Sequence, residues 1–443
     1  MEAKRFYKEL NKLMLPIAFQ AFMLAAVAAS DTIMLGFIDQ NQLAAVSLAT
    51  RVQFVQNIGL SGLVGGAMIL CAQYFGKSET DKINRIFSIT LRYSIILSVI
   101  FWALSFFIPD FLMRIFTDDI NMINIGANYL KIASWSYLLI GISQIYLCMM
   151  KVGNKAHLAM ISSLSVIVNI LLNAVLIYGL FGVPKMEAAG AALATVIARI
   201  IELIVCIILF TKVKNIKLNF KGIISIDLAL EKSFFKISAP LFLNESIWGV
   251  GITLYSIIIG HLGSDATAAN SIASVIKDLV TSLCRGVGVG GGILLGYKLG
   301  LNDFDTAKKY GNKLIKISVI VGVLCAILIF ILSPIRYLFE LTNEANSYLF
   351  IMLIICMFYM VAKSINITAI NGIFYAGGDT KFDAYSLAVT MWGIIIPLAL
   401  LGGFVFSWPV LAIYLIISLD EIIKIPWVLY HYKKYKWLNN LTN

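Results

Sequence analysis

Long apolar stretches alternate with short polar segments along the whole chain. Each apolar stretch is long enough to supply the roughly 20 residues that an α-helix needs to cross the hydrocarbon core of a bilayer. Twelve stretches can be placed, near residues 13–38, 47–75, 87–111, 125–150, 157–182, 188–211, 234–262, 270–298, 314–338, 347–376, 384–406 and 409–431. The pattern predicts an all-α polytopic membrane protein with twelve transmembrane helices.

The composition excludes a soluble protein and a disordered one. Of 443 residues, 60% are hydrophobic and 13% are charged, whereas soluble domains are near half apolar and a quarter charged, and disorder requires low hydrophobicity. The net charge of +11 does not indicate nucleic-acid binding, because the basic residues form short clusters between apolar stretches instead of one solvated patch.

The distribution of Lys and Arg predicts the orientation in the membrane. Most of these residues lie at the N-terminus, in the connections after even-numbered helices and in the C-terminal tail. The opposite side has only Arg114, Lys185 and Arg336. Because cytoplasmic loops carry the excess of basic residues, we expect a multi-pass protein of the plasma membrane with both termini in the cytoplasm.

No motif indicates a cofactor, a metal site or an enzyme. Gly286, Gly288 and Gly291 satisfy GxGxxG, but they lie inside an apolar stretch and not between a strand and a helix. The cysteines form no CxxC pair and all lie in apolar stretches, where they are expected to pack as small residues: Cys71, Cys148, Cys206, Cys284, Cys325 and Cys356.

The sequence repeats itself with a shift of 224 residues. Pro16 then falls on Pro240, and each proline permits a kink in the first helix of its half. Other matches are Gly36 with Gly260, Ser47 with Ser271, Gly62 with Gly286 and Gly153 with Gly377. We therefore expect two six-helix bundles related by a pseudo-twofold axis along the membrane normal, at 1–211 and 234–443, with a cytoplasmic linker at 212–233.

Ionisable residues inside the apolar stretches are candidates for function, because a charge in the bilayer is costly unless it is paired or hydrated. Asp31, Glu245 and Lys363 lie well inside their helices. We expect Glu245 and Lys363 to form a direct or water-bridged ion pair next to the substrate cleft. Others are expected to snorkel or to form local ion pairs, including Arg51, Lys131, Arg285, Asp420, Glu421 and Lys424.

Two amides and a hydroxyl add neutral oxygens to the first half. Asn169 and Asn173 are four residues apart on the fifth helix and so share a face, and Thr195 lies on the sixth. Together with a carboxylate, such oxygens suit a monovalent cation or a protonated acid. Ordinary hydrogen bonding between helices is the alternative interpretation of the asparagine pair.

Several motifs in order along the chain resemble those of the multidrug and toxic compound extrusion (MATE) family. They are Leu15-Pro16, Asp31-Thr32 with Gly36, Ala44-Ala45-Val46-Ser47, Ala72-Gln73-Tyr74-Phe75-Gly76, Gly190-Ala191-Ala192-Leu193-Ala194-Thr195, Ala239-Pro240 and Gly377-Gly378-Asp379-Thr380. The resemblance covers nearly the whole chain. It implies an antiporter that exports bulky, often cationic organic compounds in exchange for Na⁺ or H⁺ by alternating access between two bundles.

The resemblance also implies roles for particular residues. The essential acid of the family's first helix is matched by Asp31, and the surrounding oxygens are matched by Asn169, Asn173 and Thr195. No metal ion other than a Na⁺ at Asp31 is expected. A helix-seven acid of one sodium-coupled branch is matched by Glu245, but that branch's helix-ten aspartate is replaced by Ser364, beside Lys363.

Two other transporter classes remain as alternatives. A lipid-linked precursor or polysaccharide flippase of the same superfamily is one, although such proteins typically have extra helices and a more basic cleft. A major-facilitator-type transporter is the other, but its basic loop motif after the second helix is not matched by Gly76-Lys77-Ser78-Glu79-Thr80-Asp81-Lys82. In each case we expect a monomer in the bilayer that binds small organic molecules and no nucleic acid.

Overall fold

The computed structural model describes the greater part of the chain. The described residues are 2–36, 40–155, 157, 160–161, 163–213, 216–217, 223, 227–338 and 341–442. Within helices, the side chains of 2–5, 28–29, 31–33, 35–36, 40–41, 43, 264 and 338 lie outside the description.

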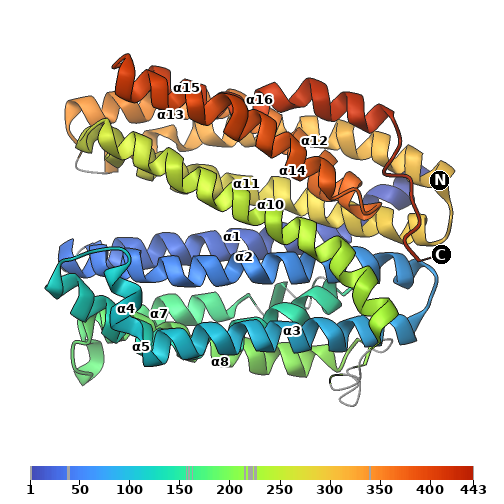
Figure 1. The fold of residues 1–443 in the computed structure, drawn as a ribbon, viewed down its shortest axis with the longest axis horizontal. Helices are drawn as coiled ribbons and strands as arrows, with labels where there is room; N and C mark the ends of the chain where they lie inside the picture. The colour runs from blue at the N-terminus through green and yellow to red at the C-terminus, as the bar shows by residue number, and fades with distance from the viewer. Residues whose placement is uncertain are drawn as a thin grey trace. The chain divides into compact units, whose positions relative to one another are not determined.

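The described residues fold almost entirely into helices. In the first half these are α1 (Glu2–Gly36), α2 (Gln40–Gly76), α3 (Thr80–Phe107), α4 (Pro109–Arg114), α5 (Ile120–Val152), α7 (Ser165–Tyr178), the short η1 (Leu180–Gly182) and α8 (Glu187–Phe210). The α3, α5 and α8 helices run side by side (Figure 1).

The second half contains α10 (Leu228–His261), α11 (Ser264–Gly300), α12 (Phe304–Leu332), η2 (Ser333–Leu338), α13 (Asn343–Asn366), η3 (Ile367–Phe374), α14 (Lys381–Leu387), η4 (Ala388–Ile395), α15 (Ile396–Leu400), η5 (Leu401–Val405) and α16 (Val410–Lys433). The η3, η4 and η5 segments are π-helical. The η3 segment continues α13, and α14, η4, α15 and η5 follow one another without a break, so that Asn343–Phe374 and Lys381–Val405 each form one spanning element.

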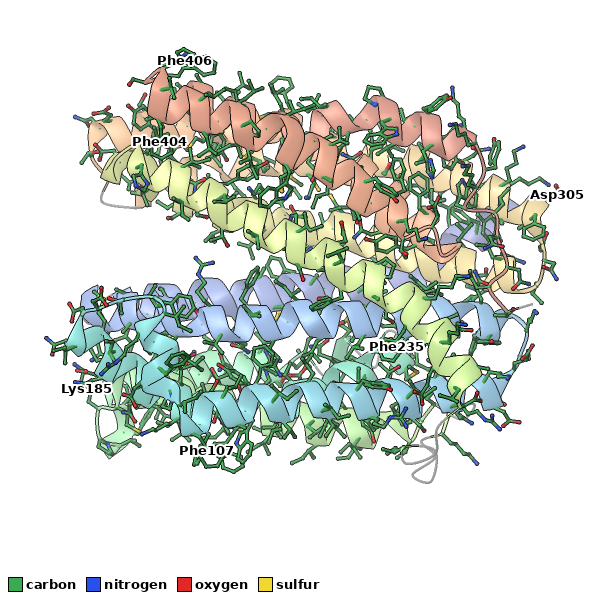
Figure 2. The ribbon with its side chains drawn as sticks, viewed as in Figure 1. Phe107, Lys185, Phe235, Asp305, Phe404 and Phe406 are labelled. Carbon is green, nitrogen blue, oxygen red and sulfur yellow. The ribbon has the colours of Figure 1, made fainter. Side chains whose placement is uncertain are left out.

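These elements correspond to the predicted apolar stretches, and the all-α membrane fold is confirmed. Ten of the described helices are long and apolar enough to cross a membrane. The α7 helix has only 14 residues, shorter than the predicted 157–182, and α16 carries three charged residues in its middle. Large apolar side chains such as Phe107, Phe404 and Phe406 project outward (Figure 2), as expected for a surface that faces lipid.

The chain divides into two compact units that follow the predicted halves only in part. One unit, here called the N-lobe, comprises Met23–Cys71 and Glu79–Ser238. The other, the C-lobe, comprises Met1–Phe22, Ala72–Ser78 and Ala239–Asn443. The beginning of α1 and the end of α2 thus group with the second half, and the beginning of α10 groups with the first.

Contacts of the C-terminal tail explain why the end of α2 belongs to the C-lobe. The Gln73 side chain donates to the Ala376 carbonyl at 2.7 Å and accepts from the Leu441 N–H at 2.6 Å. The Lys77 ammonium donates to the Thr442 carbonyl at 2.9 Å. The Gln73 amide therefore links the end of α2 to the residues after η3 and to the C-terminal tail.

Two helical elements of the C-lobe, α11 and η3, cross where both have glycine. A Cβ atom on Gly372, in η3, would lie 2.7 Å from the Gly288 carbonyl oxygen in α11, and one on Gly292 would lie 2.8 Å from the Gly372 oxygen. Real Cβ atoms do not approach that closely. Glycine at these positions therefore permits the close packing that membrane helices use.

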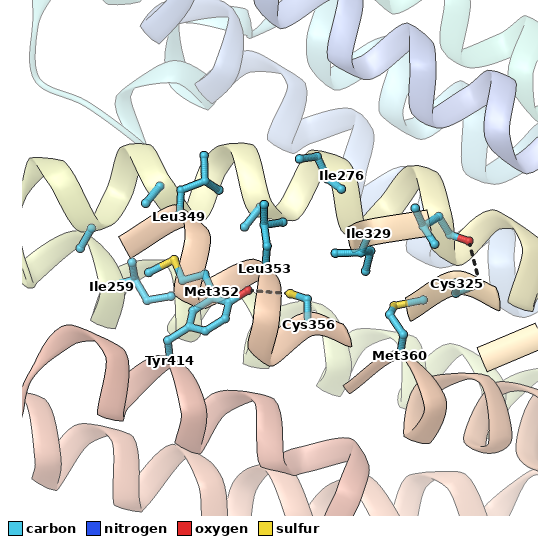
Figure 3. Close-up of a cluster of buried hydrophobic side chains, with 14 of the residues drawn as sticks. Ile259, Ile276, Cys325, Ile329, Leu349, Met352, Leu353, Cys356, Met360 and Tyr414 are labelled. Carbon is cyan, nitrogen blue, oxygen red and sulfur yellow. Dashed lines mark hydrogen bonds between the residues drawn. The ribbon is translucent and has the colours of Figure 1, made fainter. Parts of the chain in front are cut away.

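The C-lobe core is apolar and includes thiols. Ile276, Leu353 and Met360 belong to a cluster that includes three buried cysteines, two of which, Cys325 and Cys356, are labelled in Figure 3. The Cys325 thiol donates to the Val280 carbonyl, with 3.6 Å between sulfur and oxygen, and Cys356 lies 3.1 Å from the Tyr414 hydroxyl. All six cysteines are buried and free, so they pack as small residues, as predicted.

Candidate transport sites

The structure brings together the neutral polar residues predicted for the N-lobe. The Asn173 Nδ2 donates to the Asn169 Oδ1 at 3.2 Å, and the Asn169 Nδ2 lies 3.5 Å from the Thr195 Oγ1. Both asparagines are buried. Asp31 lies in α1, but its side chain is outside the described residues. The three oxygen-bearing side chains therefore form one polar cluster in an apolar bundle.

Local features of the sequence create this meeting of α7 and α8. Gly179 ends α7 in the left-handed region, at φ +74°, where glycine has no steric penalty. The chain then returns so that the Met186 N–H donates to the Leu176 carbonyl at 3.0 Å. A Cβ on Gly190 would lie 2.7 Å from that same carbonyl oxygen. The small residues before Thr195 thus permit α8 to approach α7 closely.

The C-lobe contains charged pairs, and the predicted partner of Lys363 is wrong. The Lys363 Nζ donates to the Glu421 Oε1 at 2.5 Å, while Glu245 forms no described ion pair. The Asn366 Nδ2 donates to the other Glu421 oxygen at 2.7 Å. Residues 363 and 421 lie on adjacent helices, α13 and α16, a proximity that the sequence does not reveal.

A second pair on α16 is intrahelical. The Lys424 Nζ lies 3.3 Å from Asp420 Oδ1, one helical turn apart, and the Thr390 hydroxyl donates to the same oxygen at 2.8 Å. Asp420, Glu421 and Lys424 are 5%, 7% and 3% exposed. The expectation of a local ion pair is correct for Asp420 and Lys424, but snorkelling is excluded because these charges are in the interior.

Sequence reasoning missed one buried acid, Asp383. The carboxylate of Asp383, near the start of α14, accepts a hydrogen bond from the Asn244 Nδ2 at 2.6 Å and another from the Tyr375 hydroxyl. All three residues are buried. Asp383 lies two residues after Lys381 at the edge of an apolar stretch, a pattern typical of a solvated helix end. The one signal in the sequence is Asn244, a polar residue inside another apolar stretch that needs a buried polar partner.

The remaining predicted residues occupy less specific surroundings. Glu245 is partly buried on α10, next to Asn244, and has no hydrogen bond to another described residue. Pro16 and Pro240 lie inside α1 and α10 without ending either helix. Across the described parts of the chain, no group of three His, Cys, Asp or Glu residues is arranged to hold a metal ion.

Known proteins resemble this chain over most of its length. The family model MatE matches residues 16–175 and 240–401. The probable multidrug resistance protein YoeA of Bacillus subtilis is 26% identical over 76% of this chain and 74% of its own length. The probable multidrug resistance protein NorM of Halalkalibacterium halodurans is 24% identical over 87% of this chain and 84% of its own.

The fold is also that of a transporter of known structure. A crystal structure of the Vibrio cholerae MATE transporter VcmN superposes with a TM-score of 0.88 at 15% sequence identity, covering 99% of this chain and 98% of that one. The family model matches both halves of the sequence repeat, and the superposition extends over nearly all helices. The chain therefore belongs to the MatE family of membrane transporters.

Proposed function

We propose that this transporter is a secondary active antiporter that exports bulky organic compounds, often cationic ones, in exchange for Na⁺ or H⁺. The observation that carries the proposal is the cluster of Asn169, Asn173 and Thr195, in which both asparagines are buried. The cluster belongs to the same lobe as Asp31, the family's acid position. The names of the related multidrug resistance proteins support a bulky organic substrate.

The physical mechanism requires that the coupling ion and the substrate prefer different states of the transporter, because a ligand without such a preference shifts no equilibrium. A proton or Na⁺ at Asp31 would neutralise a carboxylate within the membrane. Neutral oxygens from Asn169, Asn173 and Thr195 would complete the coordination of Na⁺ or accept the proton's hydrogen bond. Neutralisation would permit α1 to repack near its proline, and this change would release the substrate outward. A switch between states that bind substrate on one side and release it on the other is alternating access.

The proposal includes the setting of the protein. It operates in the plasma membrane as a monomer. Both termini lie in the cytoplasm, because the loops on that side carry most of the basic residues. It needs no cofactor and performs no enzymatic reaction, since transport draws its energy from an ion gradient. Glu245 and Lys363 contribute to the substrate cleft in the C-lobe.

The experiment is ion-driven efflux of a fluorescent organic dye from proteoliposomes, with Na⁺ and H⁺ gradients imposed one at a time. Asp31→Asn keeps the size of the side chain and removes its charge. We expect the variant to insert and to bind dye at equilibrium, but to lose gradient-driven efflux. Asp110→Asn, an exposed acid of the same lobe, is the control and should transport normally. Efflux by Asp31→Asn at the normal rate would contradict the proposal.

A further inference from the structure

One face of α2 is polar although the helix spans the membrane. Its side chains recur every three to four residues and line a groove of about 340 Å³, within the N-lobe; they are Ser47, Thr50, Arg51, Gln53, Phe54 and Asn57. A groove of this size is at the lower end of the range for small-molecule sites. Arg51 and Asn57 are exposed, so the face is not packed against the helices of its own lobe.

This face is incompatible with lipid. The apolar span of α2 begins at Ala44, which places Arg51 about 10 Å and Asn57 about 20 Å along the helix axis, at 1.5 Å per residue. An arginine near a helix end can snorkel, but the short side chains of Asn57 and Gln53 cannot reach the interface from that depth. Because unpaired polar groups are costly in hydrocarbon, the groove is not a lipid-facing surface.

The groove is also positively charged. Arg51 is the only ionisable residue among those that line it, and it forms no ion pair with any side chain that the structure describes. Amides at Gln53 and Asn57 and hydroxyls at Ser47 and Thr50 line the same groove, and Phe54 supplies an aromatic surface. A guanidinium presents a fork of donors that matches the two oxygens of a carboxylate.

We propose that this groove binds the transported compound through an anionic group, a carboxylate that pairs with Arg51 while an adjacent ring packs on Phe54. The inference rests on the proposed function and specifies its substrate class, namely aromatic organic acids and zwitterions. A zwitterion carries a basic amine as well, so the proposal is compatible with a substrate that is cationic elsewhere.

Another exposed basic residue of the same lobe provides a matched control. Lys131 lies eleven residues after the start of α5, as Arg51 does after the start of α2. One turn deeper on its face is Trp135, which is 46% exposed. A lysine beside an exposed tryptophan is typical of the lipid–water interface, so Lys131 lacks the polar surroundings of Arg51.

The test uses two dyes that differ only at the proposed contact: a xanthene dye with a free benzoate and the ethyl ester of the same dye. Equilibrium binding to purified protein is measured for the wild type, Arg51→Gln, Arg51→Lys and Lys131→Gln. Losing a charge-assisted hydrogen bond should raise the Kd of Arg51→Gln for the free acid at least about tenfold and leave the Kd for the ester within twofold. Arg51→Lys should be intermediate, and Lys131→Gln should match the wild type.

The outcomes separate this inference from the proposed function. Equal losses for acid and ester in Arg51→Gln, with normal elution as a single species, would mean that Arg51 has a structural role and would overturn the inference. Unchanged binding of both dyes would overturn it too. If the wild type bound the acid through Arg51 but no ion gradient drove its efflux, the antiport proposal would fail while the anion site would remain.

Discussion

The two polar clusters described above, one in each lobe, differ in chemistry although the two halves of the sequence repeat. The cluster of Asn169, Asn173 and Thr195 in the N-lobe is neutral, whereas the pairs of Lys363 with Glu421 and of Lys424 with Asp420 in the C-lobe are charged. The N-lobe also contains ion pairs outside this cluster, Arg199 with Glu202 and Arg92 with Glu231. With the shift of 224 residues, Asn173 falls on Pro397, and Glu421 falls on Ile197. The repeat therefore preserves the backbone architecture, through prolines and glycines, while each half carries its own polar residues.

This difference has an energetic consequence. Removing one member of a buried ion pair leaves the other charged and unpaired, which is strongly destabilising. Removing a neutral group costs only a hydrogen bond and some packing. Substitutions in the C-lobe ion pairs should thus affect folding first, and those in the neutral N-lobe cluster should affect transport first.

The largest effect is expected for Glu421→Ala in the C-lobe. The change leaves the Lys363 ammonium, now 2.5 Å from Glu421, without its counter-charge, and we expect destabilisation of about 3–5 kcal/mol. Thermal unfolding in detergent, followed by loss of the monodisperse species, measures it. The double variant Lys363→Met with Glu421→Leu should recover most of the lost stability. A double variant as unstable as the single one would show that the pair does not act as a unit.

A moderate effect is expected for Asn244→Leu. The substitution keeps the approximate volume and removes the amide that donates to Asp383 at 2.6 Å. Hydrogen bonds to charged groups contribute about 1.5–3 kcal/mol, and Tyr375 still donates to the same carboxylate. Ser246→Ala, which removes only a bond to the Phe242 carbonyl within the helix, is the control in the same thermal assay. Equal stability of the two variants would contradict the role given to Asn244.

A smaller effect on stability is expected for Thr195→Val in the N-lobe. The Thr195 hydroxyl is 3.5 Å from Asn169, at the limit of a hydrogen bond, so the loss should be below about 1 kcal/mol. If the proposed ion site is correct, gradient-driven efflux should nevertheless fall at least tenfold. A variant with normal efflux in both Na⁺ and H⁺ gradients would remove Thr195 from that site.

The smallest effect is expected at the surface, where α10 begins. The Leu230 N–H and the Arg85 guanidinium lower the pKa of Asp227. A lowered pKa in the folded state means that the contribution is present above the unfolded pKa of about 3.9 and is lost as the pH falls through the folded pKa. Exposed pairs contribute about 0.2–1 kcal/mol. The Tm difference between wild type and Asp227→Asn should therefore be small at pH 7 and should shrink as the pH falls below about 3.9; a difference independent of pH would exclude this pairing.

The sequence predicts the helices well because each span needs a long apolar stretch, a requirement that is local. It also predicts the Asn169–Asn173 contact, since i and i+4 share a helix face. It does not predict that Lys363 pairs with Glu421 instead of Glu245, because the two pairings are equally consistent with helix positions. Only the packing of α13 against α16 distinguishes them, and that packing depends on every side chain between the helices.

The crossing at Gly292 and Gly372 restricts how this protein can evolve, because a Cβ on either residue would meet a backbone carbonyl oxygen of the other helix. In most contacts a larger side chain on one helix can be compensated by a smaller one on its neighbour. Here both residues are already the smallest that exist, so no second substitution at the partner position can relieve an alanine at the first. In a comprehensive mutational scan, these two sites should tolerate no substitution, and no second substitution at the partner site should restore function. In the buried ion pairs, by contrast, replacing both members should be tolerated better than replacing one.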